Sequence, residues 1–160
     1  SVKSRGLGDV YKRQDPAENY HQKGILVESK VPANISFSLA SDAVLIASKI
    51  VNALQYVGVM GVEFFVTNEN KLLVNELAPR VHNSGHWTQS GCLINQFEQH
   101  IRAITGWTIG GAKRHSDVTM NNLLGSDIER LENEPESSVN IYGKSAIRDG
   151  RKMGHINLIN

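Results

Sequence analysis

The chain has 160 residues, of which 40% are hydrophobic and 21% are charged, and its formal net charge is +1 at pH 7. This ordinary globular composition suits one domain, or a medium domain with a small one. The near-zero charge provides no basic field for nucleic acid. No apolar run reaches the roughly 18 residues that cross a bilayer, so we expect neither nucleic acid nor a membrane as partner. The single cysteine, Cys92, cannot form an internal disulfide, which favours the cytoplasm.

The first fourteen residues differ from the rest. They carry four cations against one anion and show no hydrophobic pattern. A basic targeting segment is one interpretation, but an apolar core for a secretory signal is missing. We expect residues 1–14 to be a disordered or non-native tail.

Strand and helix patterns alternate after this tail. Residues 24–31 are typical of a strand that Pro32 ends. Residues 34–39 alternate polar and apolar side chains, which predicts a second strand. Ser41 offers an N-cap, and apolar residues at helical spacing predict a helix over 41–55, whose stripe is better explained by core packing than by a partner.

A hairpin and a second helix follow. Strands over 58–66 and 72–77 are apolar on both sides, so we expect the hairpin to be central in a sheet covered on both faces. Apolar residues recurring from Leu93 to Ile104 predict a helix that Gly106 ends. The remainder predicts strands and an exposed acidic loop, in the order strand 118–124, loop 129–138 and strands 139–142, 145–147 and 154–158. The pattern indicates an α+β fold.

Two glutamates interrupt the hairpin strands. A hairpin symmetric about the middle of Glu69–Asn70 places Glu63 directly opposite Glu76, and Phe65 opposite Val74. An odd-numbered loop would shift the register by one residue and separate the glutamates.

Like charges directly opposite on a sheet are destabilising, and a cation would relieve the repulsion between Glu63 and Glu76. Carboxylate oxygens, with Asn75 as a neighbouring carbonyl oxygen, suit Mg²⁺. Alternatively, the carboxylates meet Arg80 or another cation, or the register differs.

Donor groups follow the second strand. Arg80 can fork two hydrogen bonds to a phosphate or a carboxylate. His82 suits an anion donor or an acid–base group. Zinc bound by His82 and His86 is a weaker alternative because the two lie on a loop with Gly85. The segment from Asn83 to Gly85 is equally typical of a plain turn.

Near the end, Lys144 and Arg151 lie next to glycines. Glycine lets backbone amides approach an anion, so these cations could neutralise a phosphate. A solvated hairpin turn with basic side chains is the simpler alternative.

Several segments resemble one family. They are residues 58–65 (GVMGVEFF), 75–88 (NELAPRVHNSGHWT), 96–104 (QFEQHIRAI), 122–125 (NLLG) and 150–158 (GRKMGHINL). They are similar to the 5-(carboxyamino)imidazole ribonucleotide synthases, which are ATP-grasp ligases of purine biosynthesis. The resemblance covers about residues 15–160.

The resemblance implies the C-terminal half of an ATP-grasp domain over 15–107 and a small β-rich domain over 108–160. It implies a ligase that uses ATP and bicarbonate to form carboxyphosphate, which carboxylates 5-aminoimidazole ribonucleotide. The implied roles are magnesium binding by Glu63 and Glu76, nucleotide–metal binding by Asn75 and Glu76, catalysis facing carboxyphosphate by Arg80, His82 and Asn83, and ribonucleotide phosphate binding by Lys144 and Arg151.

The family begins with a nucleotide-fold-like domain and the first half of the ATP-grasp fold, and neither precedes these segments here. We therefore expect the isolated chain to lack substantial ligase activity, and the full-length protein to be a homodimer. A non-catalytic module that binds anions or metal and docks on a partner is the alternative from another class.

Overall fold

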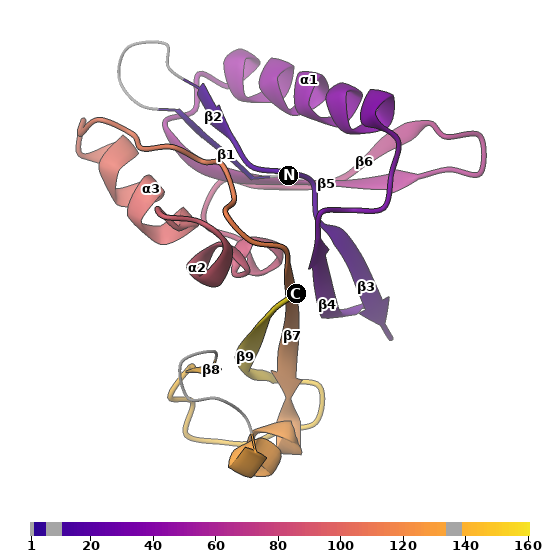
Figure 1. The fold of residues 1–160 in the computed structure, drawn as a ribbon, viewed down its shortest axis with the longest axis vertical. Helices are drawn as coiled ribbons and strands as arrows, with labels where there is room; N and C mark the ends of the chain where they lie inside the picture. Colours follow the sequence, from indigo (N-terminus) through magenta and orange to yellow (C-terminus); the bar gives the residue numbers. More distant parts are fainter. Residues whose placement is uncertain (1, 6–10, 134–138) are drawn as a thin grey trace.

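The computed structural model describes residues 2–5, 11–133 and 139–160, which form two antiparallel sheets with helices around the first (Figure 1). The strands are β1 Val2–Arg5, β2 Tyr11–Arg13, β3 Glu18–Gln22, β4 Ile25–Val31, β5 Gly58–Val66, β6 Leu72–Ala78, β7 Val118–Leu124, β8 Val139–Ile141 and β9 Lys152–Ile159. The α-helices are α1 Phe37–Ala53, α2 Thr88–Gly91 and α3 Gln96–Ile104, and the 3-10 helices are η1 Asn83–Gly85 and η2 Gly125–Asn133. Within these ranges, no helix is both long enough and apolar enough to cross a membrane.

The first sheet has the strand order β2-β1-β5-β6, and α1 covers one of its faces (Figure 1). Ala47 and Val51 on α1 pack against Met60 and Val62 on β5, and all four are buried. The apolar stripe of α1 therefore packs in the core, as its helical spacing predicts.

The helix begins earlier than predicted. Ser36, rather than Ser41, is the N-cap, and its hydroxyl accepts a hydrogen bond from the Leu39 amide. The predicted strand over 34–39 is therefore wrong. Phe37 lies in the first turn and is 88% exposed, so the alternation that suggested a half-buried strand includes an aromatic side chain that is not buried.

Only one strand of the hairpin formed by β5 and β6 is central in its sheet, although the apolar composition suggests that both are. β5 lies between β1 and β6, but β6 is an edge strand. Leu73, Val74 and Leu77 on β6 are exposed. The expectation of a hairpin covered on both faces is therefore wrong, because apolar residues predict burial without specifying what covers them.

The second sheet has the order β3-β4-β7-β9-β8 and packs on Trp87, which is 1% exposed. It combines β3 and β4 with strands from the end of the chain, so it contains residues from both sides of the predicted boundary at 107/108. The boundary itself stays a prediction. The strand expected at 145–147 is wrong, since those residues lie outside β8 and β9.

The acidic stretch predicted as a loop differs in part. Its beginning belongs to η2, which continues to Asn133, and residues 134–138 lie outside the described residues.

Residues 1–14 were expected to be a disordered or non-native tail. In the structure Val2–Arg5 pairs antiparallel with β5, and β2 pairs with β1. β1 satisfies the backbone groups on the side of β5 that faces away from β6, and any extended segment can form such bonds whatever its side chains. Whether the first fourteen residues are native stays a prediction.

α3 begins at Gln96, with the Asn95 side chain as its N-cap. Glu98 and Arg102, four residues apart on this helix, form an ion pair with 2.6 Å between Oε1 and Nη2. Its apolar residues Ile101 and Ile104 are exposed, however. The helical spacing is correct, but the apolar stripe does not face the core.

Candidate metal and anion site

The two glutamates lie opposite each other across the hairpin, as predicted. The turn between Val66 and Leu72 is odd-numbered, and next to it Phe64, not Phe65, pairs with Val74. The predicted pairing of Phe65 with Val74 is therefore wrong.

A β-bulge restores the alignment of the glutamates. Continued regularly from the turn, the register would place Asn75 opposite Glu63. Instead the register shifts between Glu63 and Phe64, so that Asn75 is the extra residue and Glu76 pairs with Glu63. The Asn75 amide remains near, with Nδ2 3.4 Å from Glu63 Oε2.

His82 completes a group of three. One ligand atom from each of Glu63, Glu76 and His82 lies within 4.8 Å of the other two. His82 Nε2 is 3.1 Å from Glu76 Oε1, and His82 Nδ1 is 3.6 Å from Glu63 Oε1. The side chains of His82 and Glu63 are each 10% exposed, whereas that of Glu76 is 52% exposed. The group is thus buried at one end and open at the other.

Burial, with a smaller contribution from Arg80, lowers the pKa of His82, although Glu63 and Glu76 act in the opposite direction. A neutral imidazole agrees with its contacts: Nδ1 is 2.8 Å from the Ser84 hydroxyl, which can donate, leaving Nε2–H to donate to Glu76. Gly61 makes room for the ring, because a Cβ atom there would lie 2.8 Å from His82 Cβ. A glycine inside an apolar strand was the sequence signal for this close approach.

The group of three opens into a cleft of about 520 Å³. Its lining residues are His21, Gly24, Leu26, Glu63, Phe65, Asn75, Glu76, Arg80, His82 and Lys152. Arg80 is exposed, and its Nη1 donates to the Val81 carbonyl at 2.9 Å. The cleft thus joins carboxylates to cations, as a site for a metal–anion complex requires.

Lys152 is the cation that sequence reasoning missed. Burial lowers its pKa, with Glu63 and Glu76 acting in the opposite direction. Arg151 and Lys152 are adjacent cations in the sequence, and the sequence does not show which of the two side chains faces the cleft. Arg151 instead donates from Nη1 to the Ala146 carbonyl at 2.9 Å, and Lys144 donates to the Lys152 carbonyl. Neither is among the residues that line the cleft, so their phosphate-binding role stays a prediction.

Asn83 also lies outside the cleft lining. Its amide forms a reciprocal pair with Asn122: each Nδ2 donates to the other's Oδ1, at 2.9 and 2.7 Å. Asn122 Nδ2 also donates to the Leu26 carbonyl on β4. These bonds link the loop after β6 to the second sheet through Asn83.

His86 lies apart from the glutamates. Its ring stacks on His155 with centroids 4.7 Å apart, and burial together with His155 lowers its pKa to about 3. The zinc alternative with both histidines is therefore not supported, since His82 groups with Glu63 and Glu76.

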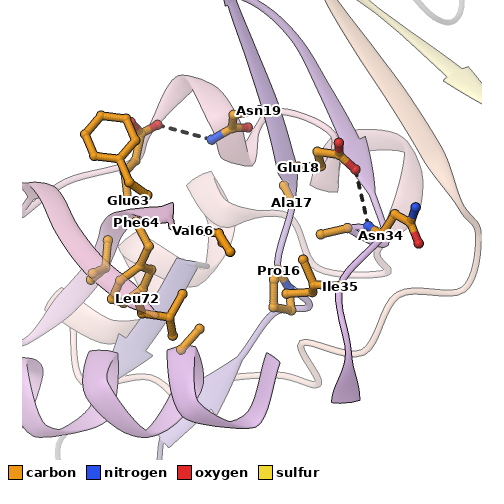
Figure 2. A pocket seen from close by; sticks show the side chains of 14 residues that line it. Pro16, Ala17, Glu18, Asn19, Asn34, Ile35, Glu63, Phe64, Val66 and Leu72 are labelled. Atoms are coloured by element: carbon orange, nitrogen blue, oxygen red, sulfur yellow. Dashed lines mark hydrogen bonds between the residues drawn. The ribbon is translucent and has the colours of Figure 1, made fainter. Parts of the chain in front are cut away.

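A second cavity, of about 330 Å³, adjoins the site (Figure 2). Glu63 and Phe65 line both cavities. Figure 2 shows Asn19 directed at Glu63, with Nδ2 3.3 Å from Oε1. Ser29 Oγ donates to Asn19 Oδ1 at 2.7 Å, which fixes the amide so that its donor faces the carboxylate. Asn19 is thus a second residue near the site that sequence reasoning did not assign.

The donor set fits a hard divalent cation. Two carboxylates converge within ligand distance, Asn75 lies beside them, and the open end leaves room for water and anionic ligands. Imidazole nitrogen is a less favourable ligand for such a cation, and His82 Nε2 is already directed at Glu76. Glu63 and Glu76 are therefore the residues that could hold the ion.

Comparison with known proteins agrees with this geometry. The model of the ATP-grasp domain matches residues 3–97, and the model of the phosphoribosylaminoimidazole carboxylase C-terminal domain matches residues 118–160. An N5-carboxyaminoimidazole ribonucleotide synthase from Brucella melitensis is 53% identical over 148 residues, which are 91% of this chain and 41% of the relative. The one from Saccharolobus solfataricus is 46% identical over 156 residues, covering 98% of this chain and 41% of that protein.

Solved structures show the same likeness. An ADP complex of an N5-carboxyaminoimidazole ribonucleotide synthetase superposes with a TM-score of 0.94 at 39% identity, covering 99% of this chain and 43% of that one. The Aspergillus clavatus synthase with ADP and 5-aminoimidazole ribonucleotide gives 0.92 at 30% identity, covering 99% and 45%. The chain thus spans less than half the length of these proteins. The predicted fold, part of an ATP-grasp domain followed by a small strand-rich domain, is confirmed. The ATP-grasp model alone matches more than half of the residues of this chain, and the chain therefore belongs to the ATP-grasp family.

Proposed function

We propose that this chain forms the metal-binding and carboxylate-facing wall of an ATP-dependent ligase. The ligase would carboxylate 5-aminoimidazole ribonucleotide with bicarbonate. The observation that supports this most directly is the convergence of Glu63, Glu76 and His82 at the mouth of a cleft that also contains Arg80 and Lys152. The similar proteins carry the name of this activity, and one is solved with ADP and the aminoimidazole ribonucleotide.

The reaction needs charge neutralisation and alignment more than a protein nucleophile. Bicarbonate oxygen attacks the γ-phosphorus of ATP, ADP leaves, and carboxyphosphate forms. The amine of the ribonucleotide then takes the carboxyl group and releases phosphate. Mg²⁺ held by Glu63 and Glu76 would neutralise the ATP phosphates during the first step.

The chain's own residues then have separable roles. His82 donates from Nε2 to Glu76 and so holds that half-exposed carboxylate in one orientation. Arg80 and Lys152 extend into the same cleft and would bind the carboxyl and phosphoryl oxygens of carboxyphosphate. Asn83, whose amide pairs with Asn122 on β7, would hold the site loop to the second sheet beside its predicted role of facing carboxyphosphate.

Two further assignments belong to the proposal. Lys144 and Arg151 would receive the ribonucleotide phosphate, so in the full-length enzyme Lys144→Ala should chiefly raise the apparent KM for the ribonucleotide. An unchanged KM would show that Lys144 does not have this role. We also propose that the full-length protein is a homodimer in the cytoplasm, where its buried free Cys92 would stay reduced.

A chimera tests the proposal. The matching part of the Brucella melitensis relative is replaced by this chain, with which it shares 53% identity over 148 residues. We expect ATP consumption that depends on both bicarbonate and aminoimidazole ribonucleotide. A folded chimera that binds Mg²⁺ and anions but never consumes ATP, while the parental relative does, would favour the non-catalytic binding module instead.

A further inference from the structure

α3 places polar side chains against the protein. Gln96 and Gln99 are 0% and 1% exposed, whereas Ile101 and Ile104 on the same helix are more than half exposed. Burying an amide is unfavourable unless its donors and its acceptor find partners. The two glutamines must therefore be explained by what they bind.

Each glutamine pairs with the backbone of one loop residue. Gln96 Oε1 accepts from the His82 amide at 2.9 Å, and Gln96 Nε2 donates to the His82 carbonyl at 2.8 Å. Gln99 makes the same pairing with Gly110: Nε2 donates to the carbonyl at 2.9 Å, and Oε1 accepts from the amide at 3.1 Å. The two pairings share their chemistry, helix and burial, but they hold different loops.

The loop held by Gln96 is the one that presents the candidate site. His82 lies beyond the end of β6, so strand pairing does not fix its backbone. The Gln96 side chain instead binds both the backbone amide and the backbone carbonyl of His82, as a neighbouring strand would. Gln96 Nε2 also lies 2.8 Å from His86 Nδ1, which accepts because Gln96 Oε1 is already bound to the His82 amide. Three contacts from one side chain thus fix this loop.

We infer that Gln96 is a positioning residue of the metal site: its amide fixes the His82 backbone so that the imidazole lies between Glu63 and Glu76. The inference rests on the metal-binding part of the proposed function. Gln99 has the same bonds without any connection to the glutamates, and it therefore separates positioning from general stability.

The test uses Gln96→Met and Gln99→Met in the 160-residue chain. Methionine keeps an unbranched side chain of similar length and removes both hydrogen-bonding groups. The readouts are the NMR signals of the His82 imidazole in metal-free protein, and Mn²⁺ affinity measured by electron paramagnetic resonance. Mn²⁺ shares the oxygen-ligand preference of Mg²⁺.

We expect Gln96→Met to shift the His82 ring signals and to weaken Mn²⁺ binding by about 10-fold. His82 hydrogen-bonds the Glu76 carboxylate, and loss of such a partner of a metal ligand typically costs about 10- to 100-fold in affinity. Gln99→Met should leave both unchanged. A folded Gln96→Met protein with unchanged His82 signals overturns the inference, and so does an equal loss of Mn²⁺ binding in both variants.

A second variant covers a failure to fold. Gln96→Glu keeps the acceptor for the His82 amide but loses the donor to its carbonyl, and the same two outcomes apply to it. If the wild-type chain binds no Mn²⁺, the proposed metal site is wrong. The His82 signals still decide whether Gln96 positions that ring.

Discussion

Gly61→Ala should displace His82 from the glutamates. A Cβ atom at residue 61 would lie 2.8 Å from His82 Cβ and 3.1 Å from Cγ. Non-bonded carbon atoms prefer separations of about 3.5–4.0 Å, so one partner must move by roughly 1 Å. Gly61 is paired with neighbouring strands on both sides, whereas His82 lies beyond the strands and its backbone is held by the Gln96 side chain, so the histidine should move.

The magnitude follows from the two contacts affected. Overpacking of this kind costs about 1–3 kcal/mol. In a domain of this size each kcal/mol lowers Tm by about 2–4 °C. The His82 Nε2 to Glu76 Oε1 distance is 3.1 Å, and lengthening it by roughly 1 Å would break that hydrogen bond.

Urea unfolding and Mn²⁺ titration measure both effects. Gly111→Ala is the matched control, because a Cβ there would meet nothing within 4 Å. We expect Gly61→Ala to lose stability and Mn²⁺ affinity while Gly111→Ala retains both. If Gly61→Ala unfolds at the wild-type urea concentration and binds Mn²⁺ normally, Gly61 does not create the space for His82.

Three further predictions concern other groups. Glu76→Gln should abolish Mn²⁺ binding by removing one carboxylate, whereas Glu69→Gln, on the exposed turn, should bind as the wild type does in a calorimetric titration. Burial raises the pKa of the Cys92 thiol to about 11, so a thiol reagent at pH 8 should react with it only as fast as the protein opens; rapid labelling of the native protein would contradict this. Burial lowers the pKa of His155 to about 4. As pH falls below about 6.5, this histidine is therefore protonated in the unfolded chain before it is protonated in the folded one. The free energy of unfolding should decline from pH 6.5 towards pH 4, by up to about 1.4 kcal/mol per pH unit. His155→Gln should reduce that slope by the share of His155 in urea unfolding curves at successive pH values, while the share of His86, whose pKa burial also lowers, remains. An unchanged slope would show that His155 contributes nothing to it.

The glutamate pair was predictable because residue number alone relates positions across a hairpin. Its local register was not, because the prediction assumed a regular ladder. The actual turn is odd, and the bulge at Asn75 compensates for it. The odd-numbered turn and the bulge together give the same pairing of Glu63 with Glu76 as a regular hairpin with an even-numbered turn. Only the neighbouring pair of Phe64 with Val74 shows that the register near the turn differs.

Helices were predictable as elements but less so in their ends and faces. Ser36 and Ser41 are both acceptable caps, and a propensity argument cannot choose between them. In α3 the apolar spacing predicts the helix correctly, yet Gln96 is buried and Ile101 is exposed. Periodicity identifies an apolar face, but tertiary contacts decide which face is covered.

Residues that act together across the chain were the hardest to assign. The pairing of Asn83 with Asn122, 39 residues further along the chain, could not be read from the sequence. The predicted role of Asn83 facing carboxyphosphate stays a prediction. Lys152 and Asn19 enter the site from β9 and β3, and only the folded arrangement shows that both approach Glu63. Local patterns carry no information on such contacts.

The bulge at Asn75 increases the number of side chains that β6 can direct towards Glu63. In a regular strand consecutive residues face opposite sides, so of two neighbours only one can reach a given ligand. The bulge at Asn75 relaxes that alternation, and both Asn75 and Glu76 approach Glu63. A chain lacking Asn75 would keep the two carboxylates facing each other on an uninterrupted ladder and lose only the amide. The hairpin therefore adds the Asn75 amide, which donates to Glu63 Oε2, to the two carboxylates that face each other across it.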